Sequence, residues 1–330
     1  MKFLIAGLGS IGRRHLRNLI TLGENDIILY RTHLSTLDDE ELAEFPVETD
    51  LKTALAHRPD AVIISNPTSL HLDVAIPAAA AGCHILLEKP ISHNLDRVDE
   101  FREAVHQGGG QVLVGYQFRF HPGLQKVDTL LSQSAIGRPL SVRAHWGEHL
   151  PGWHPWEDYR QGYSARSDLG GGVALTLSHP LDYLHWLLGD VASIWALANH
   201  ISDLELDVED TFEIGLTFGN KTIGSVHLDY NQQPSSHWLE IIGSEGTIRW
   251  DCTDGAVSIF RSSTNQGWET FHTPDGFERN DMFQAEMRHF LDVVYHEAQP
   301  ICTLEDGYQA MILALAAQQS AKMGKLITLK

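Results

Sequence analysis

The sequence predicts a two-domain α/β protein, divided into residues 1–120 and residues 121–330. A glycine-rich turn stands between a strand-like and a helix-like segment at the start of the chain. Strand-like and helix-like segments then alternate through the first third, whereas longer strand-like segments joined by tight turns follow from about Pro139. A chain of 330 residues is large for one hydrophobic core, so two domains are the natural division.

The first motif is the turn Gly7-Leu8-Gly9-Ser10-Ile11-Gly12, which follows an apolar run at 3–6 and precedes a helix-like stretch at 13–20. In this order a dinucleotide pyrophosphate binds to the helix N-terminus, because glycines let the backbone approach and unpaired N–H groups point outward. The order predicts a Rossmann domain for a nicotinamide or flavin dinucleotide; the alternative is merely a tight turn. The predicted cofactor-binding residues here are Gly7, Gly9, Ser10, Ile11 and Gly12.

A strand predicted at 26–30 leads to the residues expected to contact the adenosine ribose. Arg31 stands 19 residues beyond Gly12, where NAD-binding proteins usually carry a carboxylate. A guanidinium pairs with the 2′-phosphate of NADP, which a carboxylate would repel. Arg31 and the adjacent Thr32 therefore favour NADP; NAD stays open, because a shift of one residue at the strand end would make Arg31 an ordinary exposed arginine.

The alternation continues with strands predicted at 61–65, 84–87 and 111–115 and helices at 71–81 and 95–105. Pro77 predicts a kink or a broken turn in the first of these helices, and Leu95 is expected on the buried face of the second. Such alternation implies parallel strands, whose ligands lie beyond the carboxyl ends. The residues at those ends are Ser65, Asn66, Pro67, Glu88, Lys89 and Pro90.

Two hairpins are predicted in the second domain, one with strands at 212–217 and 222–230 and one with strands at 238–242 and 247–250. They predict a predominantly antiparallel sheet, which can leave one face free to pack. A second subunit is a plausible cover for that face, so a homo-oligomer, a dimer or a tetramer, is expected.

Composition excludes several classes of function. The net charge of −19 argues against nucleic acid as a partner, since phosphate backbones require a basic surface. The N-terminal apolar run is too short for a signal peptide, and no stretch approaches the ~18 apolar residues of a membrane span. The three cysteines are far apart without a CxxC motif, and the 19 histidines form no metal-ligand spacing, so we expect no disulfide framework and no metal. A cytoplasmic protein fits these features.

Further motifs are Asn66-Pro67-Thr68-Ser69-Leu70-His71, Glu88-Lys89-Pro90, and Gly170-Gly171-Gly172 followed by His179-Pro180-Leu181-Asp182. Together with the glycine turn they make essentially the whole chain resemble the Gfo/Idh/MocA oxidoreductase family, named for glucose-fructose oxidoreductase and inositol dehydrogenase. The resemblance implies an NAD(P)-binding Rossmann domain and a second domain with a large open sheet. It also implies activity on sugars, cyclitols or nucleotide-linked sugars, with Asn66, Pro67, His71, Glu88 and Lys89 beside the cofactor.

The resemblance gives Lys89 a catalytic role, and its chemistry supports that role. Hydride transfer needs a hydroxyl held over the nicotinamide and a group that removes or supplies its proton. An ammonium that hydrogen-bonds to the reacting oxygen stabilises the alkoxide-like charge as the hydride leaves. The alternative is a surface lysine beside a strand end.

His179 is the second predicted catalytic residue. Ser178 is expected to be the N-cap of a helix that ends at Gly189, which places the His179 imidazole at a helix N-terminus. The positive end of the helix dipole disfavours an imidazolium there, so the ring can accept a proton. Asp182, three residues on, is predicted to orient the ring.

The sequence departs from the family at one position. Family members commonly carry an aspartate one turn before the histidine, whereas the residue nearest that place is Thr176. A threonine cannot act as a carboxylate base, so Lys89 and His179 would share the proton transfer.

Residues 146–160 combine tryptophans, histidines and an arginine in a segment of irregular pattern. Aromatic faces pack on sugar C–H surfaces and polar tips bond hydroxyls, so this segment predicts carbohydrate recognition. The alternatives are a loop folded over the core or a subunit contact. The predicted substrate-side residues are Arg119, Trp153, Asp158, Tyr159, Arg160, Thr176 and Asp182.

Two hypotheses of function follow. The first is an NAD(P)-dependent oxidoreductase that transfers a hydride between the nicotinamide and a hydroxyl or ketone carbon of a sugar, cyclitol or nucleotide-linked sugar. The second is a non-catalytic dinucleotide sensor on the same fold, which fold analogy does not exclude. Lys89 together with His179 favours the enzyme.

Overall fold

The computed structural model describes residues 1–32, 40–264 and 266–329, and its contacts divide the chain into two compact units. Unit 1 contains Met1–Gln117, Asp168–Gly170 and Arg279–Tyr308; unit 2 contains Phe118–Ser167, Gly171–Glu278 and Gln309–Lys330. The chain therefore leaves unit 1 three residues before the boundary predicted at 120. Residues 168–170 and 279–308, which the sequence assigned to the second domain, are grouped with unit 1. The helix at 279–294 packs there against the first helix of the chain.

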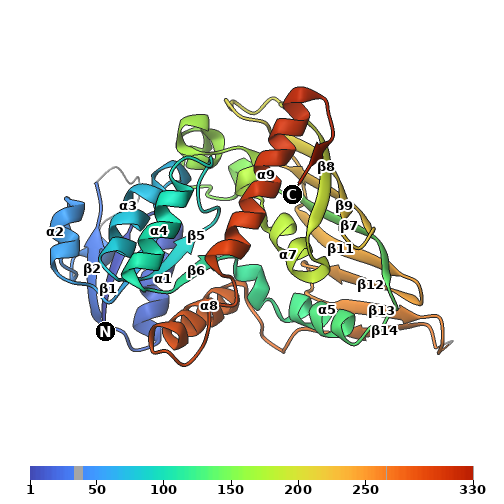
Figure 1. The fold of residues 1–330 in the computed structure, drawn as a ribbon, viewed down its shortest axis with the longest axis horizontal. Coiled ribbons are helices and arrows are strands. Elements are labelled where there is room, and N and C mark those ends of the chain that lie inside the picture. The colour runs from blue at the N-terminus through green and yellow to red at the C-terminus, as the bar shows by residue number, and fades with distance from the viewer. Residues whose placement is uncertain (33–39, 265, 330) are drawn as a thin grey trace. The chain divides into compact units, whose positions relative to one another are not determined.

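Unit 1 is built on a six-stranded parallel sheet in the order β3-β2-β1-β4-β5-β6 (Figure 1). Its strands are β1 (Lys2–Ala6), β2 (Asp26–Tyr30), β3 (Val47–Glu48), β4 (Ala61–Ile64), β5 (His84–Glu88) and β6 (Val112–Gly115). Every residue of β4 and β6 is buried, as expected for short apolar strands covered on both faces. The Rossmann arrangement predicted from the alternating pattern is confirmed.

The helices of unit 1 are α1 (Ser10–Thr21), α2 (Leu51–Ala56), α3 (His71–Ala80), α4 (Val98–Gly108) and α8 (Arg279–Val294), and Figure 1 shows α3 and α4 side by side. The broken turn predicted at Pro77 is wrong, since α3 continues through it. The helix predicted from 95 begins only at Val98, because Arg97 adopts a left-handed φ of 65°. Leu95 lies before the helix and is 49% exposed rather than buried.

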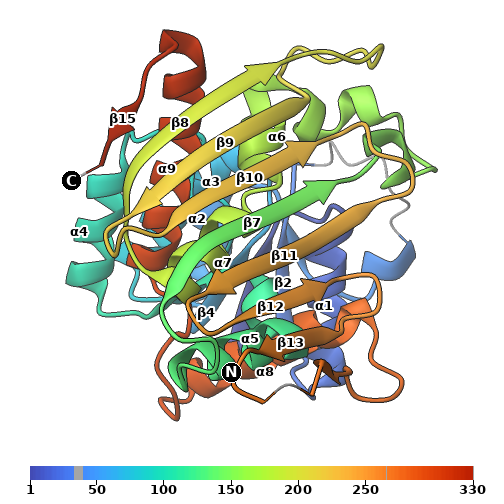
Figure 2. The same cartoon turned by 90° about the vertical axis from the view of Figure 1, so that its right-hand side faces the viewer.

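Unit 2 is built on a nine-stranded sheet in the order β14-β13-β12-β11-β7-β10-β9-β8-β15, seen face on in Figure 2. Among the described residues of this sheet, only β7 and β10 pair in parallel, so the sheet is predominantly antiparallel as predicted. Both predicted hairpins, β9–β10 and β11–β12, are confirmed. The strands are β7 (Pro139–Gly147), β8 (Val191–Asn199), β9 (Thr211–Phe218), β10 (Ile223–Asp229), β11 (Ser236–Gly243), β12 (Gly246–Asp251), β13 (Val257–Arg261), β14 (Trp268–Phe271) and β15 (Ile327–Thr328).

Helices cover one face of the unit 2 sheet. Helix α5 (Pro122–Ser132) packs on β12 and β13, α6 (Val173–Thr176) on β9 and β10, and α7 (His179–Leu188) on β7. Helix α9 (Leu304–Met323) begins in unit 1, and its unit 2 portion bonds to β8, where Ser320 Oγ accepts the backbone N–H of Ala196 at 2.9 Å. Side chains of the other face alternate outward and include Trp195, Leu197 and Ile223, which are 40%, 58% and 64% exposed.

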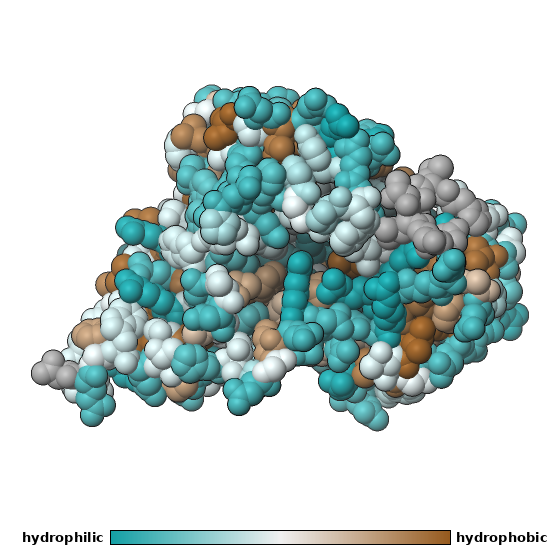
Figure 3. Space-filling view, turned by 180° about the vertical axis from the view of Figure 1, so that it is seen from behind, coloured by the Kyte–Doolittle hydropathy of each residue, from teal (hydrophilic) through white to brown (hydrophobic). Residues whose placement is uncertain are grey.

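The surface is mostly polar on the face that Figure 3 shows, where hydrophobic side chains appear in small groups among hydrophilic ones. Within residues 1–32, 40–264 and 266–329, no helix has the length and apolar character needed to cross a membrane.

Candidate active site

The glycine turn closes tightly on itself and on the end of β4. Gly7 has a φ of 95°, donates its N–H to the Tyr30 carbonyl at 3.2 Å, and lies where a Cβ would overlap the backbone of Asn66. A Cβ on Gly12 would overlap the Gly7 carbonyl oxygen. Only glycine satisfies both approaches, which explains the first and last glycines of the motif.

Gly9 differs from these two because a Cβ on it would meet nothing within 4 Å. It is the N-cap of α1, supplies no side-chain hydrogen bond, and is followed by a first turn without acidic residues. The first backbone N–H groups of a helix have no intrahelical partner, and the dipole favours an anion there. The open side of Gly9 therefore leaves room for a phosphate beside the N-terminus of α1.

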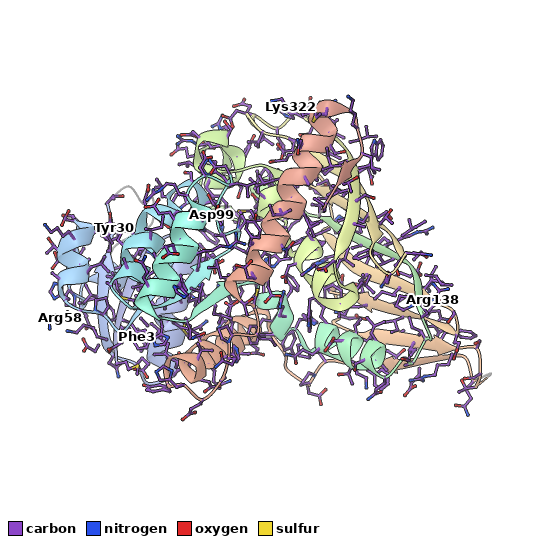
Figure 4. All side chains as sticks on the ribbon, viewed as in Figure 1. Phe3, Tyr30, Arg58, Asp99, Arg138 and Lys322 are labelled. Carbon is purple, nitrogen blue, oxygen red and sulfur yellow. The ribbon has the colours of Figure 1, made fainter. Side chains whose placement is uncertain are left out.

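Arg31 follows directly on β2, whose last residue, Tyr30, is labelled in Figure 4 at the carboxyl edge of the unit 1 sheet. Its side chain is buried, with a residue exposure of 7%, and its backbone N–H donates to the Glu48 carbonyl at 3.1 Å. Thr32 is exposed. The alternative of an ordinary exposed loop arginine does not describe this side chain.

His71 joins the turn after β4 to the turn after β5. Its Nδ1 lies 2.9 Å from the Pro90 carbonyl oxygen, and its Nε2 lies 3.0 Å from that of Asn66. Burial lowers the pKa of the His71 imidazole, whereas its hydrogen bonds to the two backbone carbonyls raise it. The cofactor role predicted for His71 would thus be exercised through the two turns it connects.

Asn66 and Pro67 form the turn after β4 and are both partly buried. The Asn66 Nδ2 donates to the Leu70 carbonyl at 3.1 Å, which aims the amide. Its Oδ1 is buried and has no hydrogen-bond partner. A buried acceptor left unsatisfied is costly, and a donor on a bound ligand would satisfy it.

Lys89 follows the carboxyl end of β5, where strand-end residues of a parallel sheet meet ligands, and it is half-buried. The preceding Glu88 is buried, accepts the Lys89 backbone N–H on Oε2 at 3.3 Å, and lies 2.8 Å from His15 Nε2 through Oε1. The Glu88 carboxylate is therefore held from α1 and anchors the turn that carries Lys89.

His179 is the first residue of α7, as predicted, and is 2% exposed. Its ring packs edge-on against Phe118, with centroids 5.0 Å apart, and lies tilted against Trp146 at 5.5 Å. Ser178 occupies the N-cap position but makes no capping hydrogen bond with its side chain. The imidazole thus lies at a helix N-terminus inside an aromatic cluster.

Asp182 and Arg119 form a buried ion pair within unit 2. Arg119 Nη2 lies 2.7 Å from Asp182 Oδ1, and Arg119 Nε lies 3.1 Å from Oδ2. Both side chains are at most 3% exposed. The sequence placed Asp182 beside His179 by helical spacing, and the structure adds a partner for its carboxylate, a guanidinium 63 residues earlier.

The segment predicted to bind carbohydrate is tied to a second loop. Arg160 pairs with Asp158 at 2.8 Å and with Glu205 at 2.7 Å, and the Tyr159 hydroxyl accepts the Glu205 backbone N–H at 3.1 Å. These three predicted substrate residues therefore hold the loop at 158–161 to residue 205. Trp153 differs, because its buried Nε1 has no partner while its ring packs edge-on against Tyr230 at 5.5 Å.

Thr176 is the last residue of α6 and is 3% exposed. It lies three residues before His179, with Leu177 and Ser178 between the two short helices. No carboxylate replaces it in this stretch of sequence.

The structure also gathers groups that sequence spacing did not predict. The ring nitrogens and carboxylate oxygens of His145, His227 and Asp229 include a set of atoms within 4.8 Å of one another. The same holds for His15, Glu88 and Glu286. In unit 2, His121, Tyr183, His237 and Trp250 join Phe118, Trp146 and His179 in one aromatic cluster. The members come from distant parts of the chain, so no local motif marks them.

The residues of unit 1 fit a dinucleotide. The open side of Gly9, the uncapped N-terminus of α1 and the unsatisfied Asn66 Oδ1 all lie at the carboxyl ends of β1 and β4. The first two suit a pyrophosphate and the third a hydrogen-bond donor.

Comparisons with known proteins agree with this geometry. A family model for an oxidoreductase family with an NAD-binding Rossmann fold matches residues 1–116, and one for the GFO/IDH/MocA C-terminal domain matches residues 124–249. The uncharacterized oxidoreductase sll0816 of Synechocystis is 32% identical over 202 residues, which cover 57% of this chain and 53% of that relative.

Two further similarities extend over the full length. Myo-inositol 2-dehydrogenase of Thermotoga maritima is 26% identical over 352 residues, covering 100% of this chain and 99% of the relative. A solved structure of levoglucosan dehydrogenase in complex with NADH has a TM-score of 0.89 at 20% identity and covers 100% of this chain and 99% of that one. At this identity the structural likeness shows the fold.

Proposed function

The chain belongs to the Gfo/Idh/MocA family of NAD-binding oxidoreductases, and from this premise we propose that it is an NAD(P)-dependent dehydrogenase or reductase acting on a carbon-bound hydroxyl of a sugar or cyclitol. The observation that carries the proposal is the pairing, within unit 1, of an open glycine turn at α1 with a lysine at the carboxyl end of β5. The inositol and levoglucosan dehydrogenases to which the chain is similar support this substrate class. The proposed class also includes nucleotide-linked sugars.

Lys89 is the proposed catalytic residue of unit 1. When bound, the nicotinamide takes or gives the hydride. The Lys89 ammonium donates a hydrogen bond to the reacting oxygen and stabilises its negative charge in the transition state. The contact between Glu88 and the Lys89 backbone N–H supports this role, because it fixes the backbone from which the lysine reaches.

His179 is the proposed proton carrier of unit 2. Its position at the N-terminus of α7 favours the neutral ring, which accepts a proton as an alcohol is oxidised and returns it in the reverse direction. With threonine at position 176, no carboxylate precedes it in the family's usual place. Arg119 and Asp182 are proposed substrate-side residues, and their buried ion pair also stabilises the start of α7.

We further propose that NADP is preferred over NAD. The support is Arg31, a buried cation directly after β2 with no carboxylate at the same position. Its guanidinium would pair with the 2′-phosphate. In the variant Arg31→Asp, the ratio of NADPH to NADH affinity is expected to fall by roughly 10-fold or more, as when a charge-assisted hydrogen bond is lost.

Trp153 is the residue of the aromatic segment that best suits a sugar, because its indole N–H lacks a partner. A homo-oligomer is proposed from the exposed apolar side chains of the outer sheet face, Trp195, Leu197 and Ile223. A cytoplasmic location is proposed from the sequence features given above.

The first experiment titrates the purified protein with NADPH and NADH by energy transfer from tryptophan, then screens sugars, inositols and nucleotide sugars for turnover. Lys89→Ala and His179→Ala are each expected to lose turnover, while the exposed-residue controls Lys52→Ala and His106→Ala retain it. Cofactor binding without turnover on any polyol or keto-sugar would favour the sensor. No binding of either dinucleotide would refute the proposal.

A further inference from the structure

A buried acidic side chain of unit 1 has no place in the function proposed above. Glu286 lies on α8 among Met282, Phe283, Met287 and Phe290, on the apolar stripe of that helix, and its exposure is 0%. Neither of its carboxyl oxygens has a hydrogen-bond partner. A buried carboxylate without a partner is among the most costly groups in a protein interior, so its state needs an explanation.

Two polar side chains, Glu88 and His15, have atoms within 4.8 Å of those of Glu286. Glu88 Oε2 accepts the Lys89 backbone N–H at 3.3 Å, and Oε1 lies 2.8 Å from His15 Nε2. Glu88 therefore has partners that stabilise a negative charge, whereas Glu286 has none, so the proton of the pair belongs on Glu286.

The protonation state of His15 follows from its two nitrogens. Nε2 lies 2.8 Å from Glu88 Oε1, whereas Nδ1 is buried and has no partner. A proton on Nδ1 would be a buried N–H without an acceptor, so the neutral ring with its proton on Nε2 fits these contacts. His15 therefore supplies no positive charge that would balance an ionised Glu286.

We propose that Glu286 is a neutral carboxylic acid that shares its proton with Glu88, directly or through one buried water, and so positions the Glu88-Lys89-Pro90 turn. Burial, and after it the Glu88 carboxylate, raises the pKa of Glu286 well above its ordinary value, in agreement with this state. The role in positioning Lys89 rests on the proposed function; the protonation state does not.

The other charged groups around the cluster favour one anion rather than two. The Arg14 guanidinium of α1 lies 4.5 Å over the ring of Phe283. It is attracted by the charge of Glu88 and repelled by that of Arg279 at the start of α8. The carboxylate whose charge acts on Arg14 is that of Glu88. An ionised Glu286 would add a second buried anion within 4.8 Å of Glu88 and push the carboxylate away from the Lys89 N–H.

The first test needs no turnover. Infrared difference spectra between the wild type and Glu286→Gln at neutral pH are expected to contain the C=O band of one protonated carboxylic acid in the wild type. The exposed control Glu297→Gln, just beyond the end of α8, leaves that band unchanged. Absence of the band in the wild type, or its persistence in Glu286→Gln, would overturn the proposal.

Stability against pH gives a second measurement without turnover. An acid whose pKa is raised on folding binds its proton in the folded state over a pH range where the unfolded chain has lost it, so wild-type stability falls as pH rises above about 4.5. Glu286→Gln lacks this loss and gains stability on the wild type as pH rises. Parallel curves of stability against pH for the two proteins would contradict a neutral acid at 286. A divalent cation held tightly by each wild-type chain but missing from Glu286→Gln would contradict it as well.

Turnover then tests the positioning role. The amide of Glu286→Gln keeps a donor and is expected to retain kcat within about 3-fold, whereas Glu286→Leu removes the donor and lowers kcat by roughly 10- to 100-fold at unchanged cofactor affinity. The wild type is expected to lose turnover at alkaline pH through a limb that Glu286→Gln lacks. Equal kcat and equal pH profiles in the wild type, Glu286→Gln and Glu286→Leu would refute the positioning role alone. No turnover in any of the three would refute the proposed function, and the infrared result would still decide the protonation state.

Discussion

The glycine turn makes a prediction in which two neighbouring alanine substitutions fail for different reasons. At Gly9 the backbone has φ −73° and ψ −167°, which alanine adopts without strain, and a Cβ would meet nothing within 4 Å. At Gly12 a Cβ would overlap the Gly7 carbonyl oxygen and approach Ser65 Oγ at 2.7 Å. Gly9→Ala should therefore fold normally but bind the dinucleotide poorly. Gly12→Ala should bind it poorly and also be destabilised.

The size of each effect follows from these contacts. The methyl group of Gly9→Ala would occupy the space through which a phosphate approaches the N–H groups of α1; losing one charge-assisted hydrogen bond costs about 1.5–3 kcal/mol, or roughly 10- to 100-fold in Kd. Its effect on stability is limited to the difference between glycine and alanine at an N-cap, under about 1 kcal/mol. Overpacking at Gly12 costs roughly 1–3 kcal/mol, since backbone atoms must move.

Cofactor affinity is measured by energy transfer from tryptophan to the reduced nicotinamide, and stability by urea unfolding followed by circular dichroism. Gly152→Ala is the matched control, because a Cβ there also meets nothing within 4 Å and its φ is not positive. Wild-type affinity in Gly9→Ala, or unchanged stability in Gly12→Ala, would refute the account of how this turn admits a phosphate.

Three further predictions concern buried groups. Asp182→Asn leaves the Arg119 charge buried and should destabilise by roughly 3–5 kcal/mol in urea unfolding, while Asp158→Asn in an exposed pair stays at the wild-type value; equal effects would show that burial does not set the cost. Burial lowers the pKa of His121 from 6.5 to about 4, so the unfolded chain binds the proton first and stability should fall by up to about 3 kcal/mol between pH 6.5 and pH 4, a loss that His121→Gln should not show. Burial raises the pKa of Cys83 to about 11, so native Cys83 should react with iodoacetamide far more slowly than in urea, and equal rates by mass spectrometry would contradict its burial.

The sequence pattern predicted correctly those strands and turns that depend on neighbouring residues alone. The run at 61–64 is wholly buried and β-branched after Ala61, and the turn around Gly219-Asn220 joins two strands that pair residue by residue. The errors fall where a single backbone or long-range contact decides. Arg97 in the left-handed region delays α4, and the packing of α8 on α1 brings residues 279–294 into unit 1.

The candidate site was predictable to the extent that its residues belong to motifs. Gly7, Gly9 and Gly12 act through backbone geometry, which a short motif specifies completely. Asp182 is different, because nothing local indicates its pairing with Arg119. Glu286 could have been noticed only as a carboxylate on an otherwise apolar helical stripe.

This difference decides what a substitution can measure. Glu88 is held by His15 from another element and in turn holds the Lys89 backbone, so a change at Glu88 alters packing, charge and the turn at once. Lys89 is half-buried at the strand end, and its replacement by alanine removes the ammonium while the carboxylate that anchors its backbone stays in place. A loss of turnover in Lys89→Ala with unchanged stability therefore shows that the lysine takes part in the chemistry. The same loss in a Glu88 variant allows that conclusion only if two controls hold: the infrared band of protonated Glu286 and the stability of the variant must both match those of the wild type.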